Sequence, residues 1–166
     1  MKLKSKLAVV AALVAALLGP AMAPIANAET ATGQVTIVAA QTCGLNFVSG
    51  NPINYGSLTI GQVSTEQTLV IDNTGTGTGA LSVAGTNWLA GATTVMNVGA
   101  TQYAPTPGVA YGAAPKISLT TAGASIGNIS PTTNMNLYWQ LRADLVAGQT
   151  SFAGSATQTV TFTSAC

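Results

Sequence analysis

The sequence predicts an all-β protein, built as a two-sheet antiparallel sandwich behind a cleaved N-terminal signal peptide. After residue 28, no stretch keeps the 3.6-residue apolar periodicity of an amphipathic helix. Short runs of alternating apolar and polar residues recur instead, separated by turns rich in Gly, Pro and Asn. Seven or eight such strands in a single domain, residues 29–166, favour a sandwich of immunoglobulin-like or jelly-roll type.

Residues 1–28 have the pattern of a secretory signal peptide. Three lysines precede an apolar run at 7–18, and Ala26-Asn27-Ala28 then offers a small-x-small cleavage site. We therefore expect a mature chain that begins at Glu29 and is secreted or held at the cell surface. The apolar run is shorter than the roughly 20 residues that a membrane-spanning helix needs, and no later segment is long enough, so no span is expected in the mature chain.

In the first half of the mature chain, the clearest strand is expected at 33–43. Its residues Val35, Ile37 and Ala39 share one face. A turn region is expected at 46–53, followed by a short extended piece. Two further apolar runs, at 65–72 and 80–84, flank the sequence Asn73-Thr74-Gly75-Thr76-Gly77-Thr78-Gly79, and the pattern predicts a β-hairpin with a long loop.

In the second half, Trp88 is expected to close one end of the core. Short strands are expected at 95–98 and 116–119, with a proline-containing loop or edge strand between them at 104–114 and a turn region at 122–133. The cleanest alternation lies at 134–145 and predicts a half-buried central strand, with one face made by Met135, Leu137, Trp139, Leu141 and Ala143. The last strand, at 157–166, points Val160 and Phe162 inward.

The mature chain is almost free of charge. Lys116 and Arg142 stand against Glu29, Glu66, Asp72 and Asp144, which gives a formal net charge of −2. A basic surface for nucleic acid or for anionic lipid is therefore excluded. A polar surface with few charges has little long-range repulsion against copies of itself, so self-association or binding to another surface protein is expected.

The two cysteines are Cys43 and Cys166. An even cysteine count in an exported protein favours a disulfide, which would close a loop of about 120 residues and stabilise the fold by roughly 4 to 5 kcal/mol on the chain-entropy model. Both residues share the parity of the inward face of their strands, so a bond between the first and last strands is expected. A bond between subunits is the alternative.

No catalytic constellation is present in the sequence. The chain has no histidine, the commonest general base and metal ligand, and its carboxylates do not fall into a pair suited to glycoside hydrolysis. Asp72 and Asn73 suit turn capping better than calcium binding. We expect a protein that is not an enzyme, with no cofactor and no metal.

Two features suggest contacts with partners. Tyr103, Tyr111 and Tyr138 are the aromatics expected to be free for contacts, whereas the parity of Trp139 points it inward. Asn128-Ile129-Ser130 is a glycosylation sequon, weakened by Pro131.

Three segments resemble known surface domains. ATGQVTIVAAQTCGLNF followed by INYG resembles the start of pilin-like and spore-coat-type domains. INYGSLTIGQVSTEQTLVIDNTGTGTGALSV and LYWQLRADLVAGQTSFAGSATQTVTFTSA are similar to the middle and the end of prokaryotic immunoglobulin-like surface domains. The resemblance implies a structural subunit of a surface filament, thread or coat, joined by donor-strand exchange, and the candidate donor carries Val35, Ile37 and Ala39. The alternative is a secreted, monomeric adhesin or carbohydrate-binding module.

Overall fold

The computed structural model describes residues 31–40, 44–151 and 154–166, and within them the chain forms twelve β-strands and one 3-10 turn. The elements in chain order are β1 (Ala31–Ala40), β2 (Leu45–Ser49), β3 (Ile53–Leu58), β4 (Gln67–Asn73), β5 (Gly79–Gly85), β6 (Trp88–Ala90), β7 (Thr93–Met96), η1 (Val98–Ala100), β8 (Thr101–Ala104), β9 (Ile117–Ser118), β10 (Ala124–Ile129), β11 (Asn134–Leu141) and β12 (Ser155–Ala165). The predicted signal peptide lies outside the described residues.

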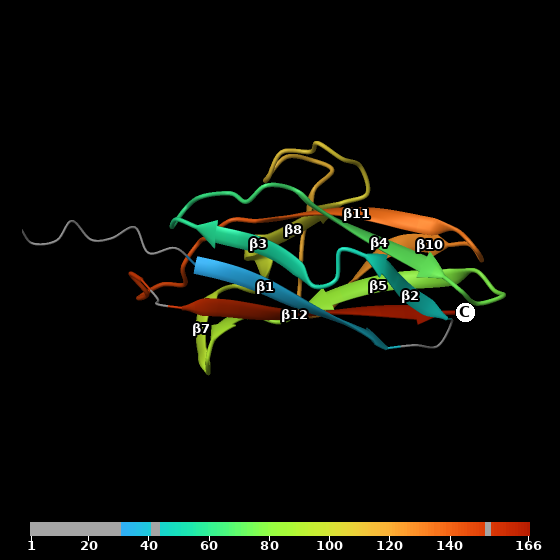
Figure 1. Cartoon of the computed structure of the whole chain (residues 1–166), viewed down its shortest axis with the longest axis horizontal. Helices are drawn as coiled ribbons and strands as arrows, with labels where there is room; N and C mark the ends of the chain where they lie inside the picture. Colours follow the sequence, from blue (N-terminus) through green and yellow to red (C-terminus); the bar gives the residue numbers. More distant parts are fainter. Residues whose placement is uncertain (1–30, 41–43, 152–153) are drawn as a thin grey trace, which may run out of the picture.

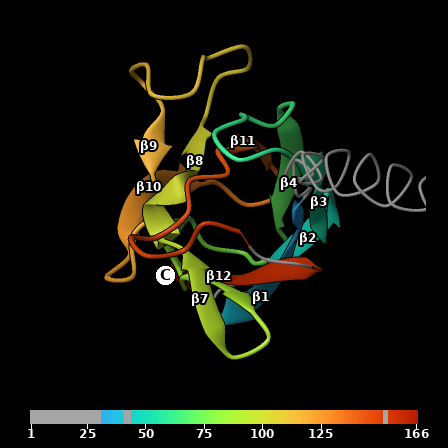
Figure 2. The same ribbon diagram turned by 90° about the vertical axis from the view of Figure 1, so that its left-hand side faces the viewer.

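These strands form two sheets packed face to face, which confirms the predicted sandwich (Figure 1). The first sheet has the order β10-β5-β12-β1-β3, and the β6–β7 hairpin is attached to it through β12. The second sheet has the order β2-β4-β11-β8-β9. Among the described strands, the pairs are antiparallel with one exception, since β1 runs parallel to β12. The β6–β7 hairpin and the loop between β8 and β9 project from opposite sides of the body (Figure 2).

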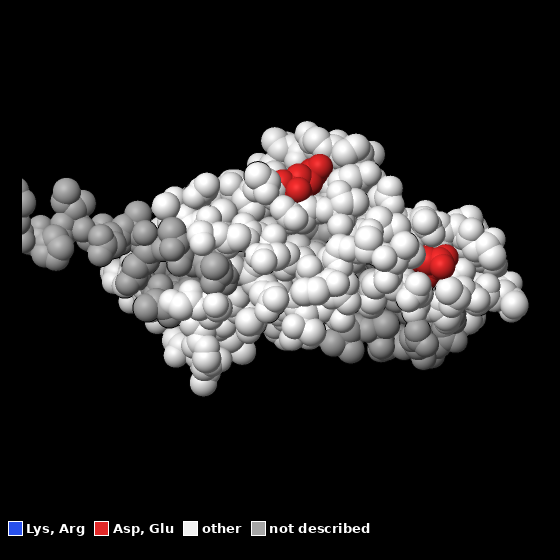
Figure 3. All heavy atoms as spheres, in the orientation of Figure 1, with Lys and Arg blue, Asp and Glu red and all other residues white. Residues whose placement is uncertain are grey.

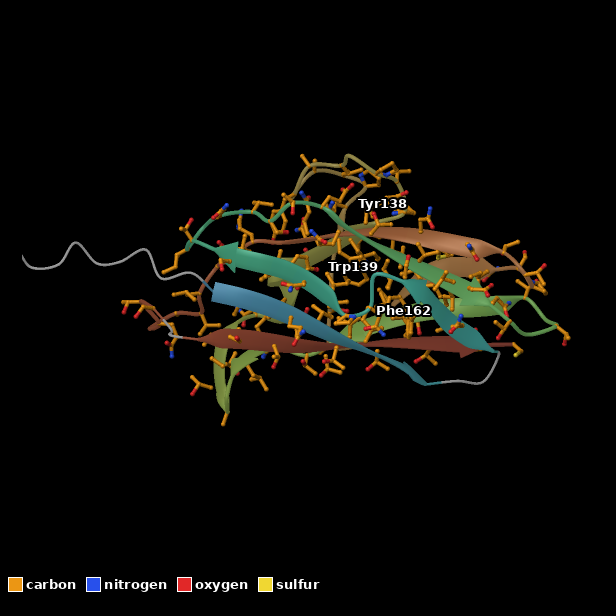
Figure 4. All side chains as sticks on the ribbon, in the orientation of Figure 1. Tyr138, Trp139 and Phe162 are labelled. Carbon is orange, nitrogen blue, oxygen red and sulfur yellow. The ribbon has the colours of Figure 1, made fainter. Side chains whose placement is uncertain are left out.

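The core lies between the sheets and is centred on aromatic side chains. Trp139 of β11 and Phe162 of β12 point toward each other across the interior, with ring centroids 6.1 Å apart and an edge-on arrangement (Figure 4). Trp88 is fully buried, as predicted. On β11, Leu137, Trp139 and Leu141 are buried, so the predicted inward face is confirmed. Edge-on ring pairs are favourable because the positive ring edge meets the negative ring face.

The predicted hairpin between residues 65 and 84 is wrong. Strand β4 belongs to the second sheet and β5 to the first, so residues 74–78 cross from one sheet to the other as an arch. Asn73 holds the arch, because its side-chain amide donates to the carbonyls of Gly77 (2.8 Å) and Ile129 (3.0 Å) and its oxygen accepts from the Gly75 amide (2.9 Å). An alternating pattern shows which face of a strand is buried, and both strands do face the same core.

Two regions predicted to be turns contain strands. Strand β2 overlaps the expected turn at 46–53, and β10 lies within the expected turn at 122–133. Both are edge strands, and each pairs with a single neighbour. On β10 only Ile129 is fully buried. An edge strand that buries so little leaves a weak apolar pattern in the sequence, which explains why it was missed.

A chain of buried hydrogen bonds joins the two sheets. The Trp88 indole N–H donates to the hydroxyl of Thr101 on β8 (2.9 Å), which donates in turn to Oε1 of Gln158 on β12 (2.8 Å). The Gln158 amide then donates to the carbonyl of Thr86 (2.8 Å). Thr101 and Gln158 are no more than 1% exposed. A buried polar network that is satisfied in this way fixes how one sheet sits on the other.

We predict that Thr101→Val lowers the free energy of unfolding by about 1 to 3 kcal/mol, because it leaves the Trp88 N–H and the Gln158 carbonyl buried without this partner. Thr163→Val is the matched control, since Thr163 is exposed on β12. Urea denaturation of both variants checks the prediction, and an equal effect of the two substitutions would contradict it.

Candidate functional site

Strand β1 fills a slot between β3 and β12, which we call the β1 slot. Its pairing with β12 is parallel and runs from Thr32 opposite Ser155 to Ala40 opposite Thr163. Its pairing with β3 is antiparallel and shorter. Within the described residues, β3 pairs with no other strand. Strand β1 therefore connects β3 to the rest of the first sheet (Figure 1).

The inward face of β1 contributes to the core. Val35 is fully buried and Ile37 is 6% exposed, as predicted for the candidate donor strand. The third predicted residue, Ala39, lies in β1 opposite Phe162, and its side chain is outside the described part. At Gly33 a Cβ atom would lie 3.1 Å from both the Trp88 ring and a Leu141 methyl group. The Trp88 ring thus packs directly on the backbone of β1, and a side chain at Gly33 would require the ring and the methyl group to shift by a few tenths of an ångström.

Of the two predicted disulfide partners, the structure describes only Cys166. Cys43 lies outside the described residues. Cys166 follows β12 and is exposed, so the expectation that it points into the interior is wrong. The described part of the chain contains no free cysteine. The pairing of Cys43 with Cys166 stays a prediction.

The three tyrosines predicted for contacts do not form one exposed cluster. Tyr103 is 1% exposed and packs on Trp139 with ring centroids 5.1 Å apart, so the prediction that it is free for contacts is wrong. It belongs to β8, a strand of four residues that the sequence did not reveal. Tyr138 is half-buried on β11 and points away from the interior (Figure 4). Tyr111 is half-buried in the loop between β8 and β9.

Tyr111 lies beside a polar hollow of about 410 Å³, which we call the Tyr111 hollow. It opens where η1, β8, β9, the β8–β9 loop and the chain after β11 meet, and its polar lining includes Asn97, Gln102, Tyr111, Ser118, Arg142 and Asp144. The Arg142 guanidinium lies over the Tyr111 ring, 5.0 Å from its centroid, and forms an ion pair with Asp144. Burial raises the pKa of Tyr111, an effect that Arg142 opposes. The sequence does not reveal this site, because its residues come from four separate stretches, 97–102, 111–112, 118 and 142–145.

A second ion pair lies nearby. The Lys116 ammonium is fully buried and sits 3.2 Å from Oε2 of Glu66. Among the described residues, no group of three or more His, Cys, Asp and Glu could hold a metal ion. Figure 3 shows one face of the molecule, where two small acidic spots interrupt an otherwise uncharged surface. Asn128, the candidate glycosylation site, is exposed on the edge strand β10.

Comparisons with known proteins add no relatives. No protein-family model matches the chain, and no curated protein matches it. Within the described residues, no helix is long and apolar enough to cross a membrane.

Tyr55, on β3 beside the β1 slot, generates a prediction about pH. Its hydroxyl is buried without a hydrogen-bond partner among the described residues, and burial raises its pKa above the ordinary value of 10.0. Below pH 10 the tyrosine is protonated in both the folded and the unfolded state, so its ionisation does not lower the free energy of unfolding there. Above pH 10 the unfolded chain releases this proton and the folded chain retains it, so the free energy of unfolding falls by about 1.4 kcal/mol per pH unit.

We therefore expect stability to decline as pH rises above about 10, and Tyr55→Phe to remove one tyrosine's share of that decline. At pH 7 the same substitution should change stability little, because the hydroxyl has no hydrogen-bond partner within the described ranges to lose. Denaturant melts at several pH values measure both effects. An unchanged pH slope in Tyr55→Phe would contradict the assignment.

Proposed function

We propose that the chain is an exported, non-enzymatic structural subunit of a surface filament, thread or coat, and that its copies join by exchanging β1. One observation carries the proposal. Strand β1 is the first described element, yet it lies inside a sheet, where it pairs on both sides and places Val35 and Ile37 in the core. If the predicted signal peptide is removed after residue 28, β1 begins two residues after the new N-terminus, so it could leave its slot without threading the chain through a loop.

The β1 of a second copy can make every contact that a copy's own β1 makes. Main-chain hydrogen bonds to β3 and β12 would supply affinity, and the positions of Val35 and Ile37 would supply specificity. Exchange of an identical element costs little for this reason. If each copy inserts its β1 into the slot of the next copy, the interface between them is head-to-tail. Such an interface builds open filaments when the rotation between copies does not close a ring.

The low surface charge supports assembly. The described part of the chain contains five charged residues, and four of them are already joined in two ion pairs. Copies of such a protein repel one another little at long range, so short-range contacts decide whether they associate.

The register of β1 and β12 supports the Cys43–Cys166 disulfide. The offset between paired positions is constant from 32 with 155 to 40 with 163, and the positions 43 and 166 differ in number by the same amount. Adjacent strands lie about 4.7 to 4.9 Å apart, within the range of Cα separations that a disulfide bridges. Because the register belongs to the slot, a β1 that enters another copy's slot would bring its Cys43 to that copy's Cys166. The bond would then join subunits.

The alternative function, a monomeric carbohydrate-binding module with an exposed aromatic cluster, has less support. Tyr103 is buried, and so are Trp88 and Trp139. We therefore place the structural role first.

The exchange of β1 can be tested by crosslinking between copies. Gln34 on β1 and Thr157 on β12 are paired and both exposed, so a short thiol crosslinker can join cysteines at these positions. We expect Gln34→Cys and Thr157→Cys, placed in separate copies and refolded together, to form covalent dimers.

The matched control replaces Thr157→Cys with Ser125→Cys, which is exposed on β10 at the far edge of the same sheet. It should give only background dimers. A chain that carries both Gln34→Cys and Thr157→Cys reports the opposite outcome. The proposal fails if this double variant crosslinks only within one chain at every protein concentration and the mixed copies give no dimers. In that case β1 occupies only the slot of its own chain.

A further inference from the structure

The charged residues of this chain gather at one corner of the molecule. Four of the five in the described part either line the Tyr111 hollow or anchor the loop that forms its wall. Arg142 and Asp144 line the hollow. Lys116 and Glu66 hold the loop between β8 and β9. Because charged residues are rare in this protein, the presence of four of them at or beside one hollow requires an explanation.

The wall of the hollow is fixed by hydrogen bonds that need no ligand. Glu66 accepts from the Gly108 amide (3.0 Å), and Lys116 donates to the Val109 carbonyl (3.0 Å). Further along the loop, the Tyr111 hydroxyl donates to the Ala100 carbonyl (3.0 Å), and the Gly112 amide donates to Oε1 of Gln102 (2.7 Å). A site that is ordered in advance spends less of its binding energy on ordering itself.

The Arg142–Asp144 pair is not explained by stability. The two side chains are 46% and 42% exposed, and an ion pair that is open to solvent adds little to the stability of a fold. The pair does present a fixed row of donors beside a fixed acceptor, because Arg142 is held over the Tyr111 ring. The hydrogen bond to Asp144 raises the pKa of Arg142, and a guanidinium is charged at neutral pH even without this bond.

The chemistry of the hollow selects its ligand. Its two charges cancel, which disfavours a phosphate or a basic peptide. The groups around the pair are neutral, namely the Asn97 amide, the Gln102 amide and the Ser118 hydroxyl. The Gln102 amide already donates to the Ser118 hydroxyl (3.0 Å) and accepts from the Gly112 amide, which fixes its orientation and leaves the remaining capacity of the Ser118 hydroxyl for a ligand. A ligand with adjacent hydroxyls matches them, since each hydroxyl can accept from the guanidinium and donate to the carboxylate.

We propose that the Tyr111 hollow binds a neutral carbohydrate, with neighbouring hydroxyls of one sugar ring bridging Arg142 and Asp144. A volume of about 410 Å³ lies within the usual range for small-molecule sites. This site is separate from the β1 slot and does not depend on assembly.

The test is an NMR titration of the monomeric protein with the methyl glycosides of glucose, galactose, mannose and N-acetylglucosamine. At least one of these probes should shift the backbone amides of Gly99, Gly112 and Gln102, which lie at the hollow. Asp144→Asn should weaken that binding by about tenfold or more, because it replaces charge-assisted hydrogen bonds with neutral ones.

The matched control is Asp72→Asn, which changes the described carboxylate that takes no part in this corner. It should leave the affinity unchanged. The amide spectrum of each variant also reports whether it is folded, so a loss of binding is not confused with unfolding. The proposal is overturned if none of the four glycosides shifts the amides of the hollow, or if the two substitutions weaken binding equally.

Discussion

The pairing of β1 with β12 is the interaction that joins β3 to the first sheet and that the proposed assembly depends on. It joins the first described strand to the last and extends over nine paired positions. The other edge of β1 pairs with β3. Strand β12 then pairs with β5 and β6 along its other edge. Without β1, the edges of β3 and β12 would both be open, and Val35 and Ile37 would be missing from the core. An open edge of this kind is a ready template for another strand.

Polar residues have different roles in the interior and on the surface of this protein. Inside, Trp88, Thr101 and Gln158 form a satisfied network that fixes the relation of the two sheets. Outside, most of the face shown in Figure 3 is uncharged. Four of the five described charged residues line the Tyr111 hollow or anchor the loop beside it. The first arrangement favours a rigid body and the second leaves most of the surface free of long-range repulsion. Together they suit a unit that packs against copies of itself while one corner stays available for a ligand.

The burial of side chains was easier to predict from the sequence than the pairing of strands. Alternation correctly placed Val35, Ile37 and Trp139 inward, because the direction of a side chain in a strand repeats every two residues. It could not show that β4 and β5 lie in different sheets, since strands on both sides of a core have the same pattern. Tyr103 was misjudged because its strand is short. The Tyr111 hollow was missed because distant segments build it.

The most direct measurement on the central claim is non-reducing denaturing gel electrophoresis of purified residues 29–166 at high concentration, beside negative-stain electron microscopy. The account predicts filaments and a ladder of covalent oligomers that collapses to monomer on reduction, because an exchanged β1 brings Cys43 to the Cys166 of its host. Deletion of residues 29–41 should abolish the filaments. A monodisperse monomer, with Cys43 bonded to Cys166 in the same chain, would contradict assembly by strand exchange.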